Sequence, residues 1–274
     1  MKSHDILSLM PNSSDIPIFA IQNVRFQFAE EDPDSMDLFS GLNLTLQEGE
    51  SLAVMGPSGV GKTTFLKLMG GLCVPNEGEV KFRGSSVYGI SSRHRRILLQ
   101  RIGMTFQRSG LFDSLTCGDN LRFPLKEVSG LAKDQIEIKV KQALEDVDLQ
   151  GTENLFVHEM SGGMQKRLGI ARAIVLSPEV ILYDEPTAGL DPLTARSINQ
   201  LIKKMREKYK MTLVVVTSDP VQAYALSDRV GFLYQGSFLE VSSTENIRNS
   251  ENPVVRQFLR GLLRGPLTEE FYRD

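Results

Sequence analysis

The chain has 274 residues, which as a soft prior correspond to one large domain or two small ones. It carries 31 Lys and Arg against 34 Asp and Glu, so the overall charge does not favour binding to DNA or RNA. With 41% hydrophobic and 24% charged residues, the composition is that of a soluble globular protein. Cys73 and Cys117 lack C-x-x-C spacing, which argues against a zinc site and a disulfide framework.

The N-terminal segment 1–17 is expected to be a tail that orders only on demand. It has no long apolar core and no small-residue cleavage site, which argues against a signal peptide. Nowhere in the chain do about 18 apolar residues run together, the length that a bilayer-spanning helix needs. Any membrane role is therefore expected to come through a partner.

Two alternating patterns follow the tail. Apolar residues recur with period two from Ile18 to Phe28 and from Leu38 to Leu46, which predicts two half-buried antiparallel strands. The acidic segment between them, 29–37, is expected to be an exposed loop, because it lacks the spacing and central Gly of a calcium-binding loop.

From Ser51 the pattern changes to short continuous apolar runs separated by helical stretches. This combination favours a mostly parallel sheet covered on both faces. Residues 114–176 lack strand signals and are predicted to be a helical insertion. The predicted strands cover residues 51–55, 102–106, 180–184, 211–217 and 229–234.

The C-terminal segment, 243–274, is predicted to be a helical extension. Apolar residues from Val254 to Leu263 form a stripe at helical spacing, and arginines lie four residues apart on another face. The stripe fits packing on the chain's own domain, contact with a partner subunit or binding to a membrane surface. Gly265 and the proline after it are expected to end this helix.

A glycine-rich loop lies between a predicted strand and a predicted helix and matches G-x-x-x-x-G-K-[ST]. Its glycines let backbone N–H groups turn towards phosphates, and the helix N-terminus adds the positive end of its dipole. Lys62 is expected to reach the β- and γ-phosphates, and the Thr63 hydroxyl to bind Mg²⁺. The predicted nucleotide-binding residues are Gly56, Pro57, Ser58, Gly59, Val60, Gly61, Lys62, Thr63 and Thr64.

Two further segments fit nucleotide chemistry. The strand 180–184 ends in Asp184, which can hold Mg²⁺ through its water shell, and Glu185, which can polarise an attacking water. Ser161 is a good N-cap, but the two glycines after it are a poor start for an ordinary helix. A phosphate approaching the backbone at that helix N-terminus would account for them.

The order of these segments, with Gln107 after an apolar strand and the sequence LYDEPTAGLDP, resembles the ATP-binding cassette (ABC) ATPases from about Ile18 to Val241. The resemblance implies an α/β P-loop NTPase core in residues 18–242, with an antiparallel β subdomain and an α-helical subdomain. It also implies ATP and Mg²⁺ as cofactors, and a homodimer or heterodimer of ATPase subunits. In that dimer, Ser161, Gly162 and Gly163 of one subunit bind the γ-phosphate of ATP held by the other.

The resemblance also gives roles to single residues. Phe28 stands where the family stacks an aromatic ring on adenine, although in a lone strand it would be a core residue. Gln107 matches the Q-loop glutamine that touches Mg²⁺ and couples nucleotide state to a membrane partner. Asp191 matches the D-loop aspartate that crosses the dimer interface. Met164 departs from the usual glutamine.

A second departure concerns catalysis directly. Where the family places a histidine that contacts the γ-phosphate and steadies the catalytic glutamate, this chain has Ser218. Serine is too short for that contact and cannot become a cation. By comparison with deletion of one transition-state hydrogen-bond donor, a loss of roughly 10² to 10³ in kcat is expected. Because Glu185 is present, we expect slow hydrolysis rather than none.

Within the superfamily, the chain most resembles the Mla-type ATPases of bacterial lipid transport. It holds one cassette, and Lys62 and Ser161 are 99 residues apart, too close for the long coiled-coil insertion of DNA-repair ATPases. The resemblance implies a permease, an MCE-type substrate-binding protein and a STAS-domain protein as partners, no nucleic acid, and a place on the cytoplasmic face of the inner membrane. The alternatives are a transporter of another substrate and a hydrolysis-poor, ATP-dependent dimerisation switch or degenerate half of a heterodimer.

Overall fold

The chain divides into two compact units in the computed structural model. The first unit combines Met1–Arg95 with Val216–Asp274, and the second is Arg96–Val215. The structure describes residues 16–28, 36–107, 109–128 and 130–268. Most of the predicted tail and most of the predicted acidic loop therefore lie outside the described residues.

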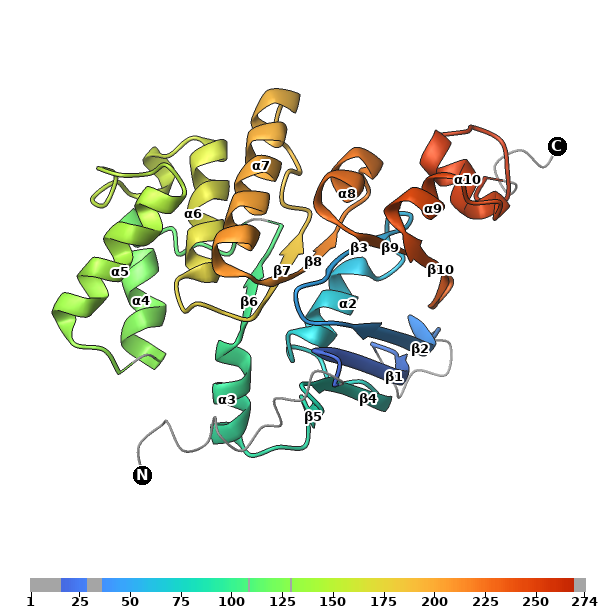
Figure 1. Ribbon diagram of the computed structural model, residues 1–274, viewed down its shortest axis with the longest axis horizontal. Coiled ribbons are helices and arrows are strands. Elements are labelled where there is room, and N and C mark those ends of the chain that lie inside the picture. Colours follow the sequence, from blue (N-terminus) through green and yellow to red (C-terminus); the bar gives the residue numbers. More distant parts are fainter. Residues whose placement is uncertain (1–15, 29–35, 108, 129, 269–274) are drawn as a thin grey trace. The chain divides into compact units, whose positions relative to one another are not determined.

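The first unit contains an antiparallel sheet with strand order β2-β1-β4-β5, drawn in blue and teal in Figure 1. β1 pairs with β2 on one side and with β4 on the other, which confirms the predicted antiparallel pair. These strands are β1 (Phe19–Phe26), β2 (Phe39–Leu46), β4 (Glu77–Phe82) and β5 (Ser85–Ser86).

The two predicted strands differ in how they are buried. β2 alternates as expected, with Leu42, Leu44 and Leu46 buried and the residues between them exposed. β1 instead buries both faces at its start, so the half-buried prediction is wrong for that part. The register of β1 then shifts between Ile21 and Val24 at a β-bulge that contains Asn23, whose φ is 49°. The extra residue of the bulge changes which side chains face the core.

The first unit also holds the strand that leads into the glycine-rich loop. β3 (Ser51–Met55) is buried throughout and runs parallel to β9 (Arg229–Tyr234), and β9 pairs with antiparallel β10 (Ser237–Ser243). The turn between β9 and β10 has positive φ at both central residues, as tight hairpins require. The helices of this unit are α2 (Lys62–Met69), α8 (Pro220–Leu226), α9 (Thr244–Arg248) and α10 (Pro253–Arg260).

The C-terminal helix ends earlier than predicted. α10 begins at an N-cap Asn252 and stops at Gly261, whose φ of 60° suits a C-terminal cap, so the helix does not continue to Gly265. Part of its apolar stripe packs on its own unit: Val255 is fully buried, and the ring of Phe258 contacts that of Phe232 in β9 at a centroid distance of 5.2 Å, whereas Leu262 and Leu263 after the helix are exposed. The structure therefore shows packing on its own unit for Val255 and Phe258, and contact of the exposed end with a partner subunit or a membrane surface stays a prediction.

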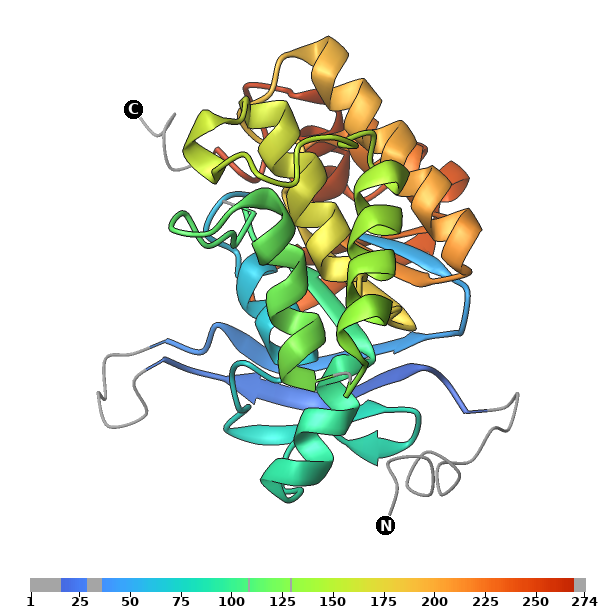
Figure 2. The same cartoon turned by 90° about the vertical axis from the view of Figure 1, so that its left-hand side faces the viewer.

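In the second unit, strand β7 (Val180–Asp184) lies between β6 (Ile102–Thr105) and β8 (Thr212–Val216), and the β6–β7 pair is parallel. Helices α4, α5 and α6 run side by side in Figures 1 and 2 and form the predicted α-helical subdomain, while α7 lies against α6. The helices are α4 (Cys117–Val128), α5 (Lys133–Asp146), the short 3-10 turn η1 (Val157–Glu159), α6 (Gly162–Ile174) and α7 (Pro192–Tyr209).

Helix α3 (Ser92–Gln100) carries the basic run of residues 93–96 and leads into β6. None of the helices in the described part of the chain combines the length and the apolar character needed to cross a membrane.

Candidate nucleotide-binding site

The glycine-rich loop is shaped by two glycines that no other residue could replace without a shift. Gly56 has a φ of 154°, and a Cβ added to it would lie 2.2 Å from the carbonyl oxygen of Leu233 in β9. Gly61 has a φ of 101°, and its added Cβ would lie 2.9 Å from the ring of Phe39 in β2. The neighbouring strands therefore press on the loop, and only glycine accommodates both the space and the backbone conformation.

Lys62 occupies the inside of this loop. Its ammonium donates to the carbonyl oxygens of Gly56 at 2.7 Å and Pro57 at 3.0 Å, and the residue is 8% exposed. The helix that starts here, α2, has no side-chain cap at its N-terminus. The N-terminus of α2, with the positive end of its dipole, and the ammonium of Lys62 together fit an anionic phosphate.

Ser218 lies in the same unit as the loop. The amide of Thr217 donates to the carbonyl of Val54 at 3.1 Å, so Ser218 follows directly after a residue bound to the strand that enters the loop. Ser218 is exposed, and Asp219 after it caps α8 by accepting from the amide of Val221 at 2.8 Å. The position that carries a histidine in the ABC ATPases is thus beside β3.

Phe28 follows the end of β1 and is 72% exposed. Its ring meets that of Phe26 edge to face, at a centroid distance of 5.1 Å. Phe28 is therefore not a core residue, and an exposed ring face is available for stacking on a flat ligand. Its contact with adenine stays a prediction.

In the second unit, the buried strand β7 delivers two carboxylates. Asp184 is 3% exposed, and Glu185 follows it with a φ of 44°, a left-handed conformation that is rare for a residue with a side chain. The carbonyl of Glu185 accepts from the amide of Ala188 at 3.1 Å, which closes the turn. Such strain is typical of functional positions, since the surrounding structure must hold it in place.

Gln107 follows β6, the parallel neighbour of β7. Because the carboxyl ends of parallel strands meet at one edge of a sheet, Gln107 and Asp184 emerge at the same edge. The backbone carbonyl of Gln107 accepts a hydrogen bond from the ammonium of Lys166 in α6 at 2.5 Å. Sequence reasoning missed Lys166, because nothing in the local pattern indicates a partner 59 residues away.

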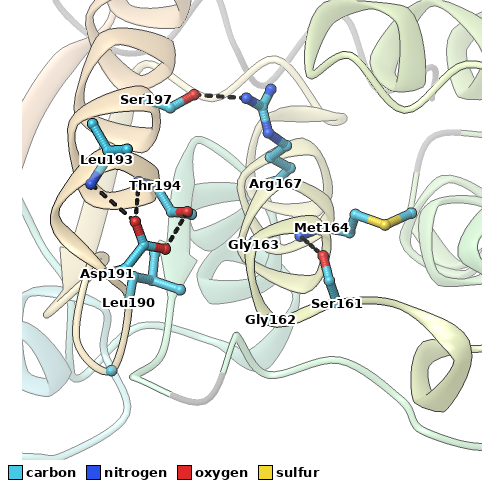
Figure 3. Close-up of a pocket in the computed structure, with 11 residues that line it drawn as sticks. Ser161, Gly162, Gly163, Met164, Arg167, Leu190, Asp191, Leu193, Thr194 and Ser197 are labelled. Atoms are coloured by element: carbon cyan, nitrogen blue, oxygen red, sulfur yellow. Dashed lines mark hydrogen bonds between the residues drawn. The ribbon is translucent and has the colours of Figure 1, made fainter.

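Figure 3 shows a pocket between the start of α6 and the start of α7. Ser161 caps α6 by accepting from the amide of Met164 at 3.3 Å, as predicted. An added Cβ on Gly163 would lie 3.1 Å from the methyl group of Thr194, so glycine allows α6 and α7 to approach closely. The pocket of about 670 Å³ is lined by Ser161, Gly162, Gly163, Met164, Arg167, Gly189, Leu190, Asp191, Leu193, Thr194 and Ser197.

Asp191 caps α7 with its side chain. Its carboxylate accepts from the amides of Leu193 and Thr194 at 3.0 Å each, and from the Thr194 hydroxyl at 2.5 Å (Figure 3). The hydrogen bond from the Thr194 hydroxyl is the main cause that lowers the pKa of Asp191. Leu193, in contrast, is 82% exposed at the mouth of the pocket.

Arg167 lines one end of the pocket and was not singled out from the sequence. Its guanidinium donates to the Ser197 hydroxyl of α7 at 2.8 Å (Figure 3). It also donates to the carbonyl of Val147 at 2.9 Å and the carboxylate of Asp148 at 2.7 Å. One side chain thus connects α6, the signature helix that starts with the signature motif Ser161–Gly163, to two other segments of the second unit.

The predicted site residues are divided between the two units. The first unit holds the glycine-rich loop, Phe28 and Ser218, and the second holds the edge with Gln107, Asp184 and Glu185 and the pocket of Figure 3. Within the described residues, no cluster of three or more His, Cys, Asp or Glu could hold a metal. A Mg²⁺ ion would then need ligands from a nucleotide as well, as is common for this ion.

This fold and this set of motifs define a P-loop ATPase, and the chain belongs to the ABC transporter family. The family profile described as "ABC transporter" matches residues 39–188, more than half of the chain. Solved structures agree. An ATP-binding cassette dimer in a post-hydrolysis state, bound to ADP and Pi, has a TM-score of 0.75 and 30% identity, and the match covers 82% of this chain and 98% of that one.

Three curated relatives have similar identities to this chain. Protein TRIGALACTOSYLDIACYLGLYCEROL 3, chloroplastic, from Arabidopsis thaliana is 37% identical, and the match covers 94% of this chain and 77% of the relative. The intermembrane phospholipid transport system ATP-binding protein MlaF of Haemophilus influenzae is 37% identical, with 84% of this chain and 87% of the relative covered. The Fe(3+) ions import ATP-binding protein FbpC of Escherichia coli is 37% identical over 83% of this chain.

Proposed function

We propose that this ABC ATPase drives lipid transport between membranes as the ATP-binding subunit of an Mla-type transporter. The observation that carries the proposal is the similarity to MlaF, which covers 84% of this chain and 87% of the relative. The plant relative also matches over 94% of this chain. The similarity to an iron importer keeps another substrate as the alternative.

In the proposed mechanism the first unit binds the phosphates of ATP. The N–H groups of the loop and the Lys62 ammonium hold the β- and γ-phosphates, and the exposed ring of Phe28 stacks on adenine. Thr63, Gln107 and Asp184 would hold Mg²⁺, which supplies charge neutralisation on the phosphates. Glu185 orients a water molecule and accepts a proton from it as the water oxygen attacks the γ-phosphorus. The bond between the γ-phosphorus and the bridging oxygen breaks, and ADP leaves with that oxygen.

The proposed assembly is a dimer in which the pocket of Figure 3 receives the nucleotide of the second subunit. Ser161, Gly162 and Gly163 present a capped helix N-terminus to it, and the exposed Leu193 supplies apolar contact area beside it. In this arrangement residues 18–242 are the ATP-binding domain, the insertion at 114–176 carries the signature motif, and 243–274 are the extension.

The proposed partners are a permease in the inner membrane, an MCE-type substrate-binding protein and a STAS-domain protein, with this chain on the cytoplasmic face. The test is to isolate the native complex and identify its subunits and bound molecules by mass spectrometry. Co-isolation of a permease with phospholipid supports the proposal, and co-isolation of a permease with an iron-binding or other solute-binding protein contradicts the lipid assignment.

The rival candidate, an ATP-dependent dimerisation switch, is favoured by the serine at position 218. The two candidates differ in turnover. A steady-state ATPase measurement on the full chain and on Glu185→Gln decides between them: hydrolysis that Glu185→Gln abolishes supports the motor. ATP-dependent dimerisation with equal, background hydrolysis in both supports the switch.

A further inference from the structure

One face of the signature helix α6 holds the segment that follows β6. Lys166, Gly169 and Arg172 are three residues apart and therefore share that face. The Lys166 ammonium bonds the carbonyl of Gln107, and the Arg172 guanidinium bonds the carbonyl of Gly110. Three positions of α6, one on each successive turn, thus contact Gln107, Ser109 and Gly110, the segment called the Q-loop here.

In the middle of this contact, Gly169 packs closely against Ser109. A Cβ added to Gly169 would lie 3.0 Å from the Cβ of Ser109 and 3.3 Å from its carbonyl oxygen. Ser109 is buried and has a φ of 62°, so its backbone conformation is specified by the contact rather than by its own preference. Arg172 adds a second hold, since its guanidinium lies over the Phe112 ring at 4.4 Å.

Lys166 differs from Gly169 and Arg172 because its ammonium also interacts electrostatically with the carboxylates of Asp184 and Glu185. Burial lowers the pKa of its ammonium, and the negative charges of Asp184 and Glu185 oppose that shift. The remaining space beside it is a cavity of about 10 Å³ that Thr105 also lines. That volume has room for one water molecule, which would give the buried Thr105 hydroxyl a hydrogen-bond partner.

We propose that Lys166 is the positioning residue of the Q-loop: by holding the Gln107 carbonyl, it restricts the direction in which the Gln107 side chain leaves the backbone at the sheet edge where Asp184 also emerges. Because Lys166 lies only a few residues after Ser161–Gly163 on the same helix, a displacement of the helix start by a bound nucleotide moves the anchor of Gln107 with it. The inference rests on the proposed function, in which Gln107 meets the Mg²⁺ of bound ATP.

The test compares three variants of the full chain. Lys166→Met keeps the length of the side chain and removes the donor, Lys166→Arg restores a cationic donor, and Lys203→Met removes an exposed lysine on α7 as a matched control. The measurements are kcat and KM for ATP, the affinity for a non-hydrolysable ATP analogue with and without Mg²⁺, and thermal unfolding.

We expect Lys166→Met to lower kcat by about ten-fold and to reduce the Mg²⁺-dependent gain in analogue affinity to a similar extent, as for other residues that orient a metal ligand. Affinity without Mg²⁺ and KM should change by less than about two-fold, because the glycine-rich loop is intact. Lys166→Arg should recover most of the loss, and Lys203→Met should match the unmodified chain.

Two outcomes would overturn the inference. One is an unchanged Mg²⁺-dependent gain in Lys166→Met. The other is an equal loss of affinity with and without Mg²⁺ that accompanies a lower unfolding temperature, because this indicates a purely structural role. Failure of the unmodified chain to bind the analogue at all would instead contradict the proposed function, so the two failures are distinguishable.

Discussion

Single residues make the glycine-rich loop of this chain typical of its family and one position after β8 atypical. Gly56 and Gly61 are required by the strands that press on the loop, and Lys62 is held by the carbonyls of the loop itself. Glu185 is present with a strained backbone. The departure is Ser218, which follows Thr217, the residue whose amide bonds the strand that leads into the loop.

At this scale we predict that Ser218→His raises kcat by up to roughly 10² to 10³, because an imidazole supplies the transition-state contact that serine cannot reach. KM for ATP should change little, since ground-state binding is provided by the glycine-rich loop. The measurement is steady-state hydrolysis by purified chain, with the Ser218→His, Glu185→Gln double variant as the control. No gain in rate would refute the proposed role of this position.

At the scale of elements, polar and aromatic clusters decide how helices are joined. Asp146 at the end of α5 is 6% exposed and accepts from the Lys208 ammonium of α7 at 2.5 Å and from the Tyr209 hydroxyl. Gln142 adds a third hydrogen bond at 2.8 Å. Helix α10 is joined to β9 by an aromatic contact instead. The buried, hydrogen-bonded carboxylate of Asp146 and the pair of rings each fix how two elements pack against each other.

The Asp146 cluster leads to a pH-dependent prediction. Burial acts to raise the pKa of Asp146, but the hydrogen bonds from Lys208, Tyr209 and Gln142 outweigh it and the pKa is lowered. A carboxylate with a depressed native pKa contributes stability above its unfolded-state pKa, and this contribution is lost as the pH falls through the native value. Asp146→Asn should therefore be less stable by about 1–3 kcal/mol at pH 7.

Urea denaturation of both proteins at pH 7 and at several values below about 4 measures this difference. The difference in the free energy of unfolding should shrink as the pH is lowered, because both chains then carry an uncharged group at position 146. A difference that is constant across this range would contradict the electrostatic explanation.

The packing of α10 leads to a second prediction about elements. Phe258→Ala removes the ring that contacts Phe232 and should destabilise the chain by about 2–4 kcal/mol. Leu263→Ala is the matched control, because Leu263 is 77% exposed and its removal should cost less than about 0.5 kcal/mol. Thermal unfolding measures both variants. If both lose equally little stability, the contact between Phe258 and Phe232 does not hold α10 against β9.

At the scale of the whole molecule, each half of the proposed catalytic machinery is incomplete alone. The pocket of Figure 3 opens between α6 and α7 and carries no P-loop of its own within the second unit. Its mouth exposes Leu193 to 82%, a large apolar side chain next to a helix N-terminus. Exposed apolar groups beside a polar, anion-compatible surface are typical of a contact that forms with a partner.

We therefore predict that Glu185→Gln, which retains ATP, dimerises when ATP is added, and that adding Leu193→Asp prevents this. The introduced carboxylates would face the second subunit and its phosphates, which repels both. Ile138→Asp is the matched control, since Ile138 is 69% exposed on α5 and outside the pocket. Light scattering after size exclusion gives the mass; a dimer that survives Leu193→Asp would contradict the proposed interface.

The sequence by itself determined the class of fold, the order of motifs and the family, because strand, loop and helix patterns and the P-loop spacing are local properties of the chain. Only the tertiary structure decided that Phe28 is exposed, that Asp191 uses its carboxylate as a helix cap, and that α10 ends at Gly261. It also decided that Lys166 holds Gln107. The Lys166–Gln107 contact joins residues that are 59 positions apart, so it exists only when α6 packs beside the segment that follows β6. The Asp191 cap and the end of α10 are local, but their hydrogen bonds form only once the helices themselves have formed.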